Sequence, residues 1–257
     1  MARVRGAAAL IALLVSSCSA SPTTSLPVPS SSPSGAHAAV VRSPAPIVFG
    51  RSVHGRPLTV WELGPPSAPH RVLVIGVIHG DETAGRAVAL DALHLTVPPG
   101  TQLLVVPDAN PDGEAAGTRQ NAHGVDLNRN FPFDWQPLGR RGDQQYSGPK
   151  PLSEPESAAL ATLIDEVRPE VSVWFHQPVG VVDESGGDLA VERRFAADLG
   201  EPLRRLTRYP GSAVGWENHT FAGSSAFVVE LPHQVGRALE QRAVRAVQHL
   251  LVPPPHQ

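Results

Sequence analysis

The sequence predicts an α/β fold with a single domain, in which helices flank a mixed, mostly parallel central sheet. Short apolar runs alternate along the chain with longer stretches in which Ala and Leu recur at helical spacing. Several of these runs are apolar at consecutive positions, as expected of strands that are buried on both faces. Of the 257 residues, 41% are hydrophobic and 18% are charged, a composition that suits a protein with a substantial core.

The expected elements follow one another as strand and helix units. We assign strands where β-branched residues run without interruption, and helices where apolar residues recur every three to four positions. In chain order, the sequence predicts a strand at 71–78, a helix at 83–95, a strand at 103–106, a helix at 158–167, a strand at 171–175, a helix at 189–199, a strand at 226–229 and a helix at 235–251. Ser153 and Glu156 have the Ser-x-x-Glu spacing of a capping box, which predicts that both side chains bond free amides at the start of the second helix.

The first 46 residues predict targeting rather than folding. Residues 1–18 begin with two arginines, continue with a short apolar run and end in small residues before Cys18, the only cysteine. This ending resembles the lipobox of bacterial lipoproteins. We therefore expect an exported protein that is anchored outside the cell membrane through a lipid on Cys18, with secretion as the alternative. Residues 19–46 are rich in Ser and Pro and predict a disordered tether, which leaves 47–253 as the one folded domain.

Charge and cysteine content exclude some classes of partner and of stabilisation. The formal net charge is -3, and the arginines are scattered without interleaved aromatic residues, so we expect no nucleic-acid partner. One cysteine allows no disulfide within the chain, so stability outside the cell must come from packing and metal. Nothing in the sequence calls for an obligate protein partner.

Metal-ligand side chains follow two of the expected strands. His79 and Glu82 come after the strand at 71–78, and His176 follows the strand at 171–175. If these strands are parallel neighbours, all three side chains emerge at the same edge of the sheet, where open α/β sheets bind ligands. A hydrolytic zinc site uses three protein ligands of these types and keeps a position for water. The sequence therefore predicts a site for one Zn²⁺ ion.

A further motif, Gly124-Val-Asp-Leu-Asn-Arg-Asn-Phe-Pro132, supplies polar side chains that suit such a site. Asp126 is able to orient a ligand imidazole, as metal-bound histidines usually require. Asn128 and Arg129 offer a hydrogen-bonding amide and a planar cation, which suit the binding of a substrate carboxylate.

Together these ordered motifs resemble the zinc metallocarboxypeptidase family, and within it most closely the murein peptide amidases. The resemblance extends from Gly50 to about Pro232. The motifs that carry it are Gly50–Pro57, His79–Glu82, Asn110–Gly113, Thr118-Arg119, Val125–Asn130, His176 with its strand, and Phe227–Pro232.

The resemblance implies a zinc peptidase of the carboxypeptidase fold type and assigns the reacting groups. It implies that His79, Glu82 and His176 are the zinc ligands. It also implies that Arg119 polarises the scissile carbonyl and that Glu230 is the general base. The expected cofactor is therefore a single Zn²⁺ ion.

For the substrate, the resemblance implies a peptide with a free carboxylate, which Asn128 and Arg129 would hold. Digestive members also use a mobile tyrosine ahead of the catalytic glutamate, and only Tyr209 lies near that place here. Its Tyr-Pro-Gly-Ser context fits a turn equally well, so we assign it no role.

Three functions remain open from the sequence. The first is a carboxypeptidase or amidase, for which export and the tether suggest cell-wall peptides. The second is a zinc deacylase of small N-acyl amino acids, similar to the aspartoacylase and succinylglutamate desuccinylase group. The third is a binding module without activity, which the full set of metal and base residues disfavours.

Overall fold

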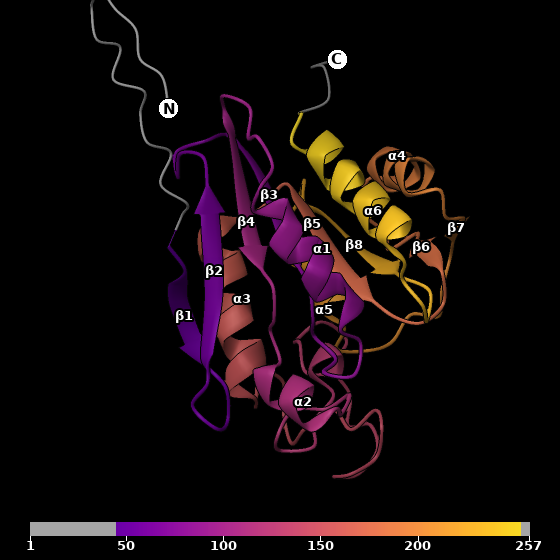
Figure 1. Cartoon of the computed structure of the whole chain (residues 1–257). Helices are drawn as coiled ribbons and strands as arrows, with labels where there is room; N and C mark the ends of the chain where they lie inside the picture. Colours follow the sequence, from indigo (N-terminus) through magenta and orange to yellow (C-terminus); the bar gives the residue numbers. More distant parts are fainter. Residues whose placement is uncertain (1–44, 253–257) are drawn as a thin grey trace, which may run out of the picture. The chain divides into compact units, whose positions relative to one another are not determined.

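The computed structural model describes residues 45–252, which form an eight-stranded sheet with helices on both faces (Figure 1). The predicted export signal, the lipidation site Cys18 and all but the last two residues of the tether lie outside this range. The strands are β1 (Ile47–Arg51), β2 (Pro57–Leu63), β3 (His70–Ile75), β4 (Thr101–Val106), β5 (Val171–His176), β6 (Val181–Asp183), β7 (Leu203–Arg204) and β8 (Ser225–Glu230). The helices are α1 (Ala84–Ala92), α2 (Pro111–Ala116), α3 (Pro155–Val167), α4 (Leu189–Leu199), α5 (Ala213–Thr220) and α6 (Arg237–Leu250), with a single 3₁₀ turn η1 (Leu127–Arg129).

The sheet is mixed and mostly parallel at its centre, as the sequence predicts. Its strand order is β1-β2-β4-β3-β5-β8-β6-β7. β3 pairs in parallel with both β4 and β5, and β5 pairs in parallel with β8. The antiparallel pairs join β1 to β2, β2 to β4 and β6 to β8. This confirms the predicted α/β architecture.

Both faces of the central strands are buried, which explains their uninterrupted apolar sequences. Along β3, Val72 and Val74 belong to the core beneath α1, α4 and α6, whereas Leu73 and Ile75 belong to the core beneath α3 and α5. Successive side chains of a strand point to opposite faces. The stretch 72–75 of β3 is therefore apolar at every residue, and Figure 1 shows the helices on either side of it.

Helix and strand ends agree with the sequence to different degrees. The bounds of α4 match the predicted helix at 189–199, and β5 extends the predicted strand by one residue to include His176. β3 is shorter than the predicted strand at 71–78, because the chain leaves the sheet after Ile75 to build the loop that carries His79.

The predicted capping box at the start of α3 is wrong. The helix begins after Glu154, and no side chain caps its amides. The hydroxyl of Ser153 donates instead to Glu154 Oε1 over 2.7 Å. Glu156 accepts from the backbone amide of Val53 over 2.9 Å and from the amide of Asn121 over 2.9 Å. Contacts with distant segments therefore replaced the local pairing that the pattern predicts.

No helix within residues 45–252 combines the length and the apolar character needed to cross a bilayer.

Candidate metal centre and substrate cavity

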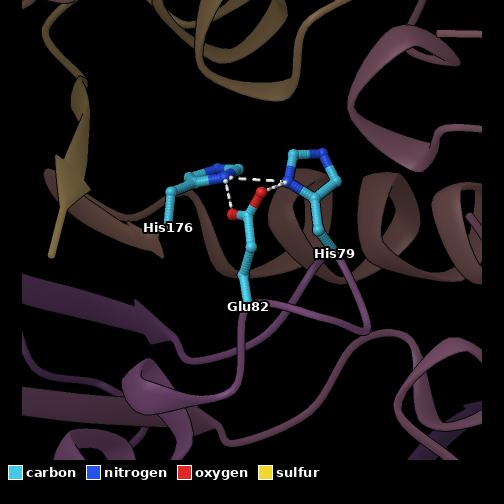
Figure 2. A group of neighbouring side chains, drawn as sticks. All are labelled: His79, Glu82 and His176. Atoms are coloured by element: carbon cyan, nitrogen blue, oxygen red, sulfur yellow. Dashed lines mark hydrogen bonds and ion pairs between the residues drawn. The ribbon is translucent and has the colours of Figure 1, made fainter. Parts of the chain in front are cut away.

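Three buried side chains converge at the carboxyl ends of two neighbouring parallel strands. His79 and Glu82 lie in the loop between β3 and α1, and His176 is the last residue of β5. His79 Nδ1 lies 2.9 Å from Glu82 Oε1 and 3.1 Å from His176 Nδ1. His176 Nδ1 lies 3.0 Å from Glu82 Oε2. Figure 2 shows the three side chains facing one another.

These distances fit a zinc ion. Two ligands of a tetrahedral zinc with bonds of about 2.0–2.1 Å are separated by roughly 3.3–3.4 Å. The 2.9–3.1 Å between the three facing atoms requires only a small outward shift to reach that separation. The histidines lower the pKa of Glu82 well below its usual range despite its burial, so its carboxylate carries the charge that a cation needs.

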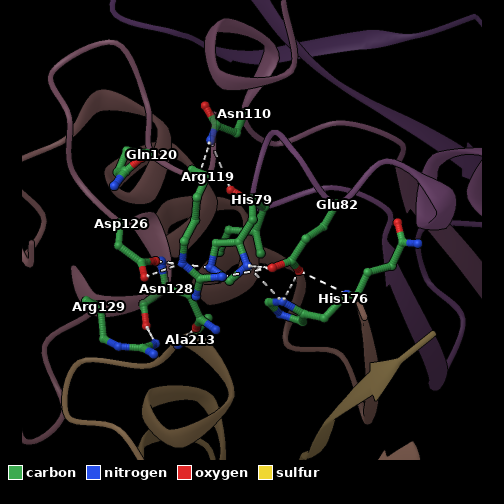
Figure 3. A network of polar contacts seen from close by, with 12 residues as sticks. His79, Glu82, Asn110, Arg119, Gln120, Asp126, Asn128, Arg129, His176 and Ala213 are labelled. Carbon is green, nitrogen blue, oxygen red and sulfur yellow. Dashed lines mark hydrogen bonds and ion pairs between the residues drawn. The ribbon is translucent and has the colours of Figure 1, made fainter. Parts of the chain in front are cut away.

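Asp126 fixes the orientation of one ligand histidine. Its Oδ1 lies 3.1 Å from His79 Nε2, so the ring N–H on that side is donated to the carboxylate and Nδ1 keeps its lone pair for metal. Asp126 is fully buried, and the nearby positive charges of His79 and Arg119 outweigh that burial and lower its pKa. It also accepts from the backbone N–H of Asn128 over 3.0 Å, which holds η1 against the centre (Figure 3).

The loop that carries His79 is held by close backbone packing. Asn110 donates from Nδ2 to the carbonyl of Ile78 over 3.1 Å and to that of Arg119 over 3.2 Å. At Gly80, a Cβ atom would lie 2.0 Å from the carbonyl carbon of Gly113, at the start of α2. Only glycine fits there, and it allows the zinc loop to pack directly on α2.

Arg119 lies beside the metal ligands. Its Nε donates to Asp126 Oδ2 over 3.0 Å and its Nη1 donates to Glu82 Oε1 over 2.8 Å. Its Nη2 makes no hydrogen bond with the described residues and stays available to a bound molecule. A guanidinium held in this way is a preorganised donor for negative charge that develops beside the metal.

Glu230 ends β8 directly opposite His176 in the parallel register. Its Oε2 is buried and has no hydrogen-bond partner within residues 45–252. Burial raises the pKa of the Glu230 carboxyl. His176 lowers this pKa and the neighbouring Glu82 raises it, and the net shift is upward. A carboxyl with a raised pKa beside a metal site is suited to accept a proton and to return it.

A cavity of about 370 Å³ opens onto this centre. Asn128 and Arg129 line it, and η1 positions both. The Asn128 side-chain oxygen accepts from the backbone N–H of Ala213 over 2.9 Å, and Arg129 Nη1 donates to the Asn128 carbonyl over 2.7 Å. Arg129 Nε is buried without a partner in the described part of the chain. The guanidinium carbon lies 4.0 Å from the ring centre of Tyr209, which also lines the cavity.

The structure brings the sequence-predicted site residues into one place. Six line the cavity together with Arg119, and Asp126 lies behind His79. The six are His79, Glu82, His176, Asn128, Arg129 and Glu230. No predicted residue within 45–252 lies away from the cavity region.

Sequence reasoning missed several residues of the site. Tyr209 contacts Arg129, although its turn-like context gave no reason to assign it a role. The backbone N–H of Gln177 donates to Glu82 Oε2 over 3.0 Å. Asp183 and Arg208 line the end of the cavity. A backbone donor and isolated charged residues belong to no sequence motif, so only the folded structure identifies them as part of the site.

Comparisons with known proteins agree with this geometry. A family model described as Zinc carboxypeptidase matches residues 45–182. Murein peptide amidase A of Escherichia coli is 34% identical over 188 residues, covering 68% of this chain and 74% of the relative. Murein peptide amidase A of Vibrio campbellii is 34% identical over 201 residues, covering 73% and 79%.

Solved structures give the same result for the fold. The crystal structure of a murein-tripeptide amidase from Escherichia coli has a TM-score of 0.68 and 29% identity, covering 83% of this chain and 94% of that one. Carboxypeptidase A from Helicoverpa armigera has a TM-score of 0.71 at 18% identity, covering 81% and 68%, a likeness of fold alone.

The fold and the three-ligand centre define a zinc-dependent hydrolase. The chain belongs to the zinc carboxypeptidase family, with its metal site at His79, Glu82 and His176.

Proposed function

We propose that this protein hydrolyses the amide bond of a cell-wall (murein) peptide next to a residue with a free carboxylate. The observation that carries the proposal is the shared cavity, which places the metal centre and Glu230 beside the buried Arg129 guanidinium. A free α-carboxylate bound to Arg129 would leave the adjacent amide close to the metal. Relatives that are 34% identical are named murein peptide amidases, which supports the class of peptide.

The chain's own residues supply the positions and the proton transfers. A zinc ion held by His79, Glu82 and His176 would polarise the scissile carbonyl and lower the pKa of the attacking water. Glu230 accepts the proton of that water as the carbon–oxygen bond forms. Arg119 donates hydrogen bonds to the carbonyl oxygen as it gains negative charge. Glu230 then returns the proton to the leaving nitrogen when the carbon–nitrogen bond breaks. The products are a carboxylate and a free amine.

Substrate orientation comes from Asn128, Arg129 and Tyr209. The guanidinium offers paired N–H donors to a carboxylate, and the Tyr209 ring covers its face. Gly211 keeps this loop close to η1, because its N–H donates to Phe133 and its carbonyl accepts from Phe131, over 3.0 and 2.9 Å. The clamp is therefore tied to the same turn that Asp126 holds against the metal centre.

The Glu230→Gln variant tests the mechanism. Glutamine keeps the shape of the side chain but cannot accept the proton, so we expect the zinc content to stay at the wild-type level and turnover to fall by about 10²–10⁴-fold. Zinc content by elemental analysis and release of the terminal amino acid from a purified wall tripeptide are the two measurements. Wild-type turnover in the variant would refute the role of Glu230.

A substrate panel tests the reaction class. Purified zinc-loaded protein is incubated with the wall tripeptide, with ordinary peptides that have a free C-terminus, and with N-acyl amino acids. We expect the wall tripeptide to be cleaved fastest. Cleavage of the N-acyl amino acids alone would replace the proposal with a deacylase. A chain that binds zinc and cleaves none of the three would be a binding module.

We also propose that the protein is exported and held at the membrane by a lipid on Cys18. The support is the sequence of residues 1–18, and cell-wall peptides lie outside the membrane. Mass spectrometry of the mature N-terminus is expected to show a diacylglycerol-modified Cys18. An unmodified N-terminus at another residue would contradict anchoring and leave secretion.

A further inference from the structure

The Gln177 side chain joins two separate segments that carry the reacting groups. Gln177 comes directly after His176 at the end of β5, and β5 lies between β3 and β8 in the sheet. The residue lines the same cavity as the metal ligands and Glu230. Its amide makes hydrogen bonds toward the zinc loop after β3 and toward the segment after β8, as the two sets of contacts below describe.

On the zinc side, Gln177 holds the start of α1 and one metal ligand. Its side-chain oxygen Oε1 accepts from the backbone N–H of Ala84 over 2.9 Å. Ala84 is the first residue of α1, and the N-cap residue Thr83 makes no side-chain capping bond, so Gln177 satisfies an amide that the helix leaves free. The backbone N–H of Gln177 donates to Glu82 Oε2 over 3.0 Å, a contact that does not depend on the side chain.

On the other side, the same amide holds the segment that follows Glu230. Gln177 Nε2 donates to the carbonyl of Pro232 over 3.1 Å and to that of His233 over 3.3 Å. Within residues 45–252 these are the only hydrogen bonds made by residues 232–235. The chain just beyond the base is therefore tied to the zinc loop through one side chain.

This tie bears on Glu230 because the carboxylate has little else to fix it. Glu230 is the last residue of β8, and its buried Oε2 has no hydrogen-bond partner in the described part of the chain. A general base must stay within hydrogen-bond reach of the proton that it accepts. A misplacement of about 1 Å is enough to lower a rate by about 10²-fold. Restraint of the next few residues therefore affects turnover.

We propose that Gln177 is a positioning residue, which holds Glu230 at a fixed place relative to the zinc ligands. It acts through Pro232 and His233 on one side and through Ala84 on the other. The inference rests on the proposed function, because it concerns the base of that reaction.

The two near-isosteres of glutamine separate the contacts. A glutamate can still accept from Ala84, but it has no donor for the carbonyls of Pro232 and His233. A methionine has a similar length and offers neither a strong donor nor a strong acceptor. Glutamate therefore removes the contacts on the base side alone, and methionine removes those on both sides.

The variants Gln177→Glu and Gln177→Met test the proposal. Both are assayed with the wall tripeptide at saturating zinc, so that differences in metal content do not enter. We expect kcat to fall by about 10–100-fold in both variants and KM to change by less than about threefold, because Arg129 is untouched. Zinc affinity, measured against a competing chelator, is expected to weaken only in Gln177→Met, which also loses the contact with Ala84.

Gln248→Glu is the matched control. Gln248 lies in α6 outside the cavity lining, and its Nε2 donates to the carbonyl of Thr96 over 3.0 Å. The substitution removes the same kind of amide-to-carbonyl bond and adds the same charge. We expect this variant to keep the wild-type kcat, KM and zinc affinity.

Wild-type kcat in both Gln177 variants would overturn the proposal. A fall in only one of them would assign the effect to the added charge or to the lost contact with Ala84, and would also overturn it. If the wild type does not cleave the wall tripeptide, the proposed function fails, and hydrogen exchange decides the inference separately. Faster exchange of the Leu231 amide in Gln177→Met than in Gln248→Glu supports the tie, and equal exchange rejects it.

Discussion

A buried carboxyl beneath the sheet gives a sharp prediction about pH and stability. Glu217 lies in α5 and is fully buried against β5. It contacts the hydroxyl of Ser172, and it accepts from Trp174 Nε1 over 3.3 Å and from the Ser224 hydroxyl over 3.4 Å. No cation pairs with it among these contacts. Burial raises the pKa of Glu217 to about 7.

The direction and size of the effect follow from linkage. Below the ordinary value of 4.5 the carboxyl is protonated in both the folded and the unfolded state, so Glu217 costs nothing. Between that pH and about 7, only the unfolded state ionises freely, and the free energy of unfolding falls as pH rises. The total loss is about 3 kcal/mol, because each pKa unit corresponds to about 1.36 kcal/mol.

The variant Glu217→Gln removes this dependence. Glutamine resembles the protonated acid, since its amide can donate to Ser172 and its oxygen can accept from Trp174. The free energy of unfolding of both proteins is measured with a denaturant at pH 4 and at pH 8. Between these pH values, the variant is expected to gain about 3 kcal/mol of stability relative to the wild type. Comparing the two proteins at each pH cancels other titrating groups.

Glu166→Gln is the matched control, because Glu166 is exposed on α3. This variant is expected to follow the wild type at both values of pH. A Glu217→Gln variant whose difference from wild type is the same at pH 4 and pH 8 would refute the reasoning that Glu217 is held in its neutral form by burial.

Two further predictions concern the site. Gly80→Ala places a Cβ 2.0 Å from the backbone of Gly113, so we expect thermal unfolding at a markedly lower temperature and weaker zinc binding. Gly236→Ala is the neutral control, because a Cβ at Gly236 would have no atom within 4 Å. Equal behaviour of the two variants would contradict the packing argument. Tyr209→Ala uncovers the carboxylate-binding guanidinium, so KM for the wall tripeptide is expected to rise by about 3–30-fold with a smaller change in kcat, and an unchanged KM would remove Tyr209 from the clamp.

The central strands could be predicted because burial on both faces requires runs of consecutive apolar residues, which are recognisable in the sequence. β3, β4 and β5 are each apolar at four of their six positions, and the parallel pairing of β3 with β5 explains why His79 and His176 meet. The alternation of strands and helices therefore predicts the parallel pairing at the centre of the sheet.

The short strands and the edge strand of the sheet could not be predicted from the sequence. β6 and β7 contain three and two residues, and β1 is an edge strand with exposed Ile47 and Val48. Segments this short show no periodicity. The pairing of Asp183 with Arg204 across β6 and β7, followed by a turn that returns Arg208 to Asp183, depends on contacts that no local pattern encodes.

The capping box failed for a related reason. Ser153 and Glu156 have the right spacing, but Glu156 is bonded to Val53 and Asn121 from distant segments. In the folded protein these tertiary contacts occupy the carboxylate, so it does not pair with a local amide as the pattern predicts.

Zinc binding to the wild type and to His176→Ala tests the central claim most directly. Protein stripped with a chelator and reloaded is analysed for metal by mass spectrometry and titrated with zinc against a competing chelator. We expect one zinc per chain in the wild type, and a loss of tight binding in the variant because His79 and Glu82 alone leave the site incomplete. A wild-type zinc content well below one, or equal affinity in both proteins, would contradict the account.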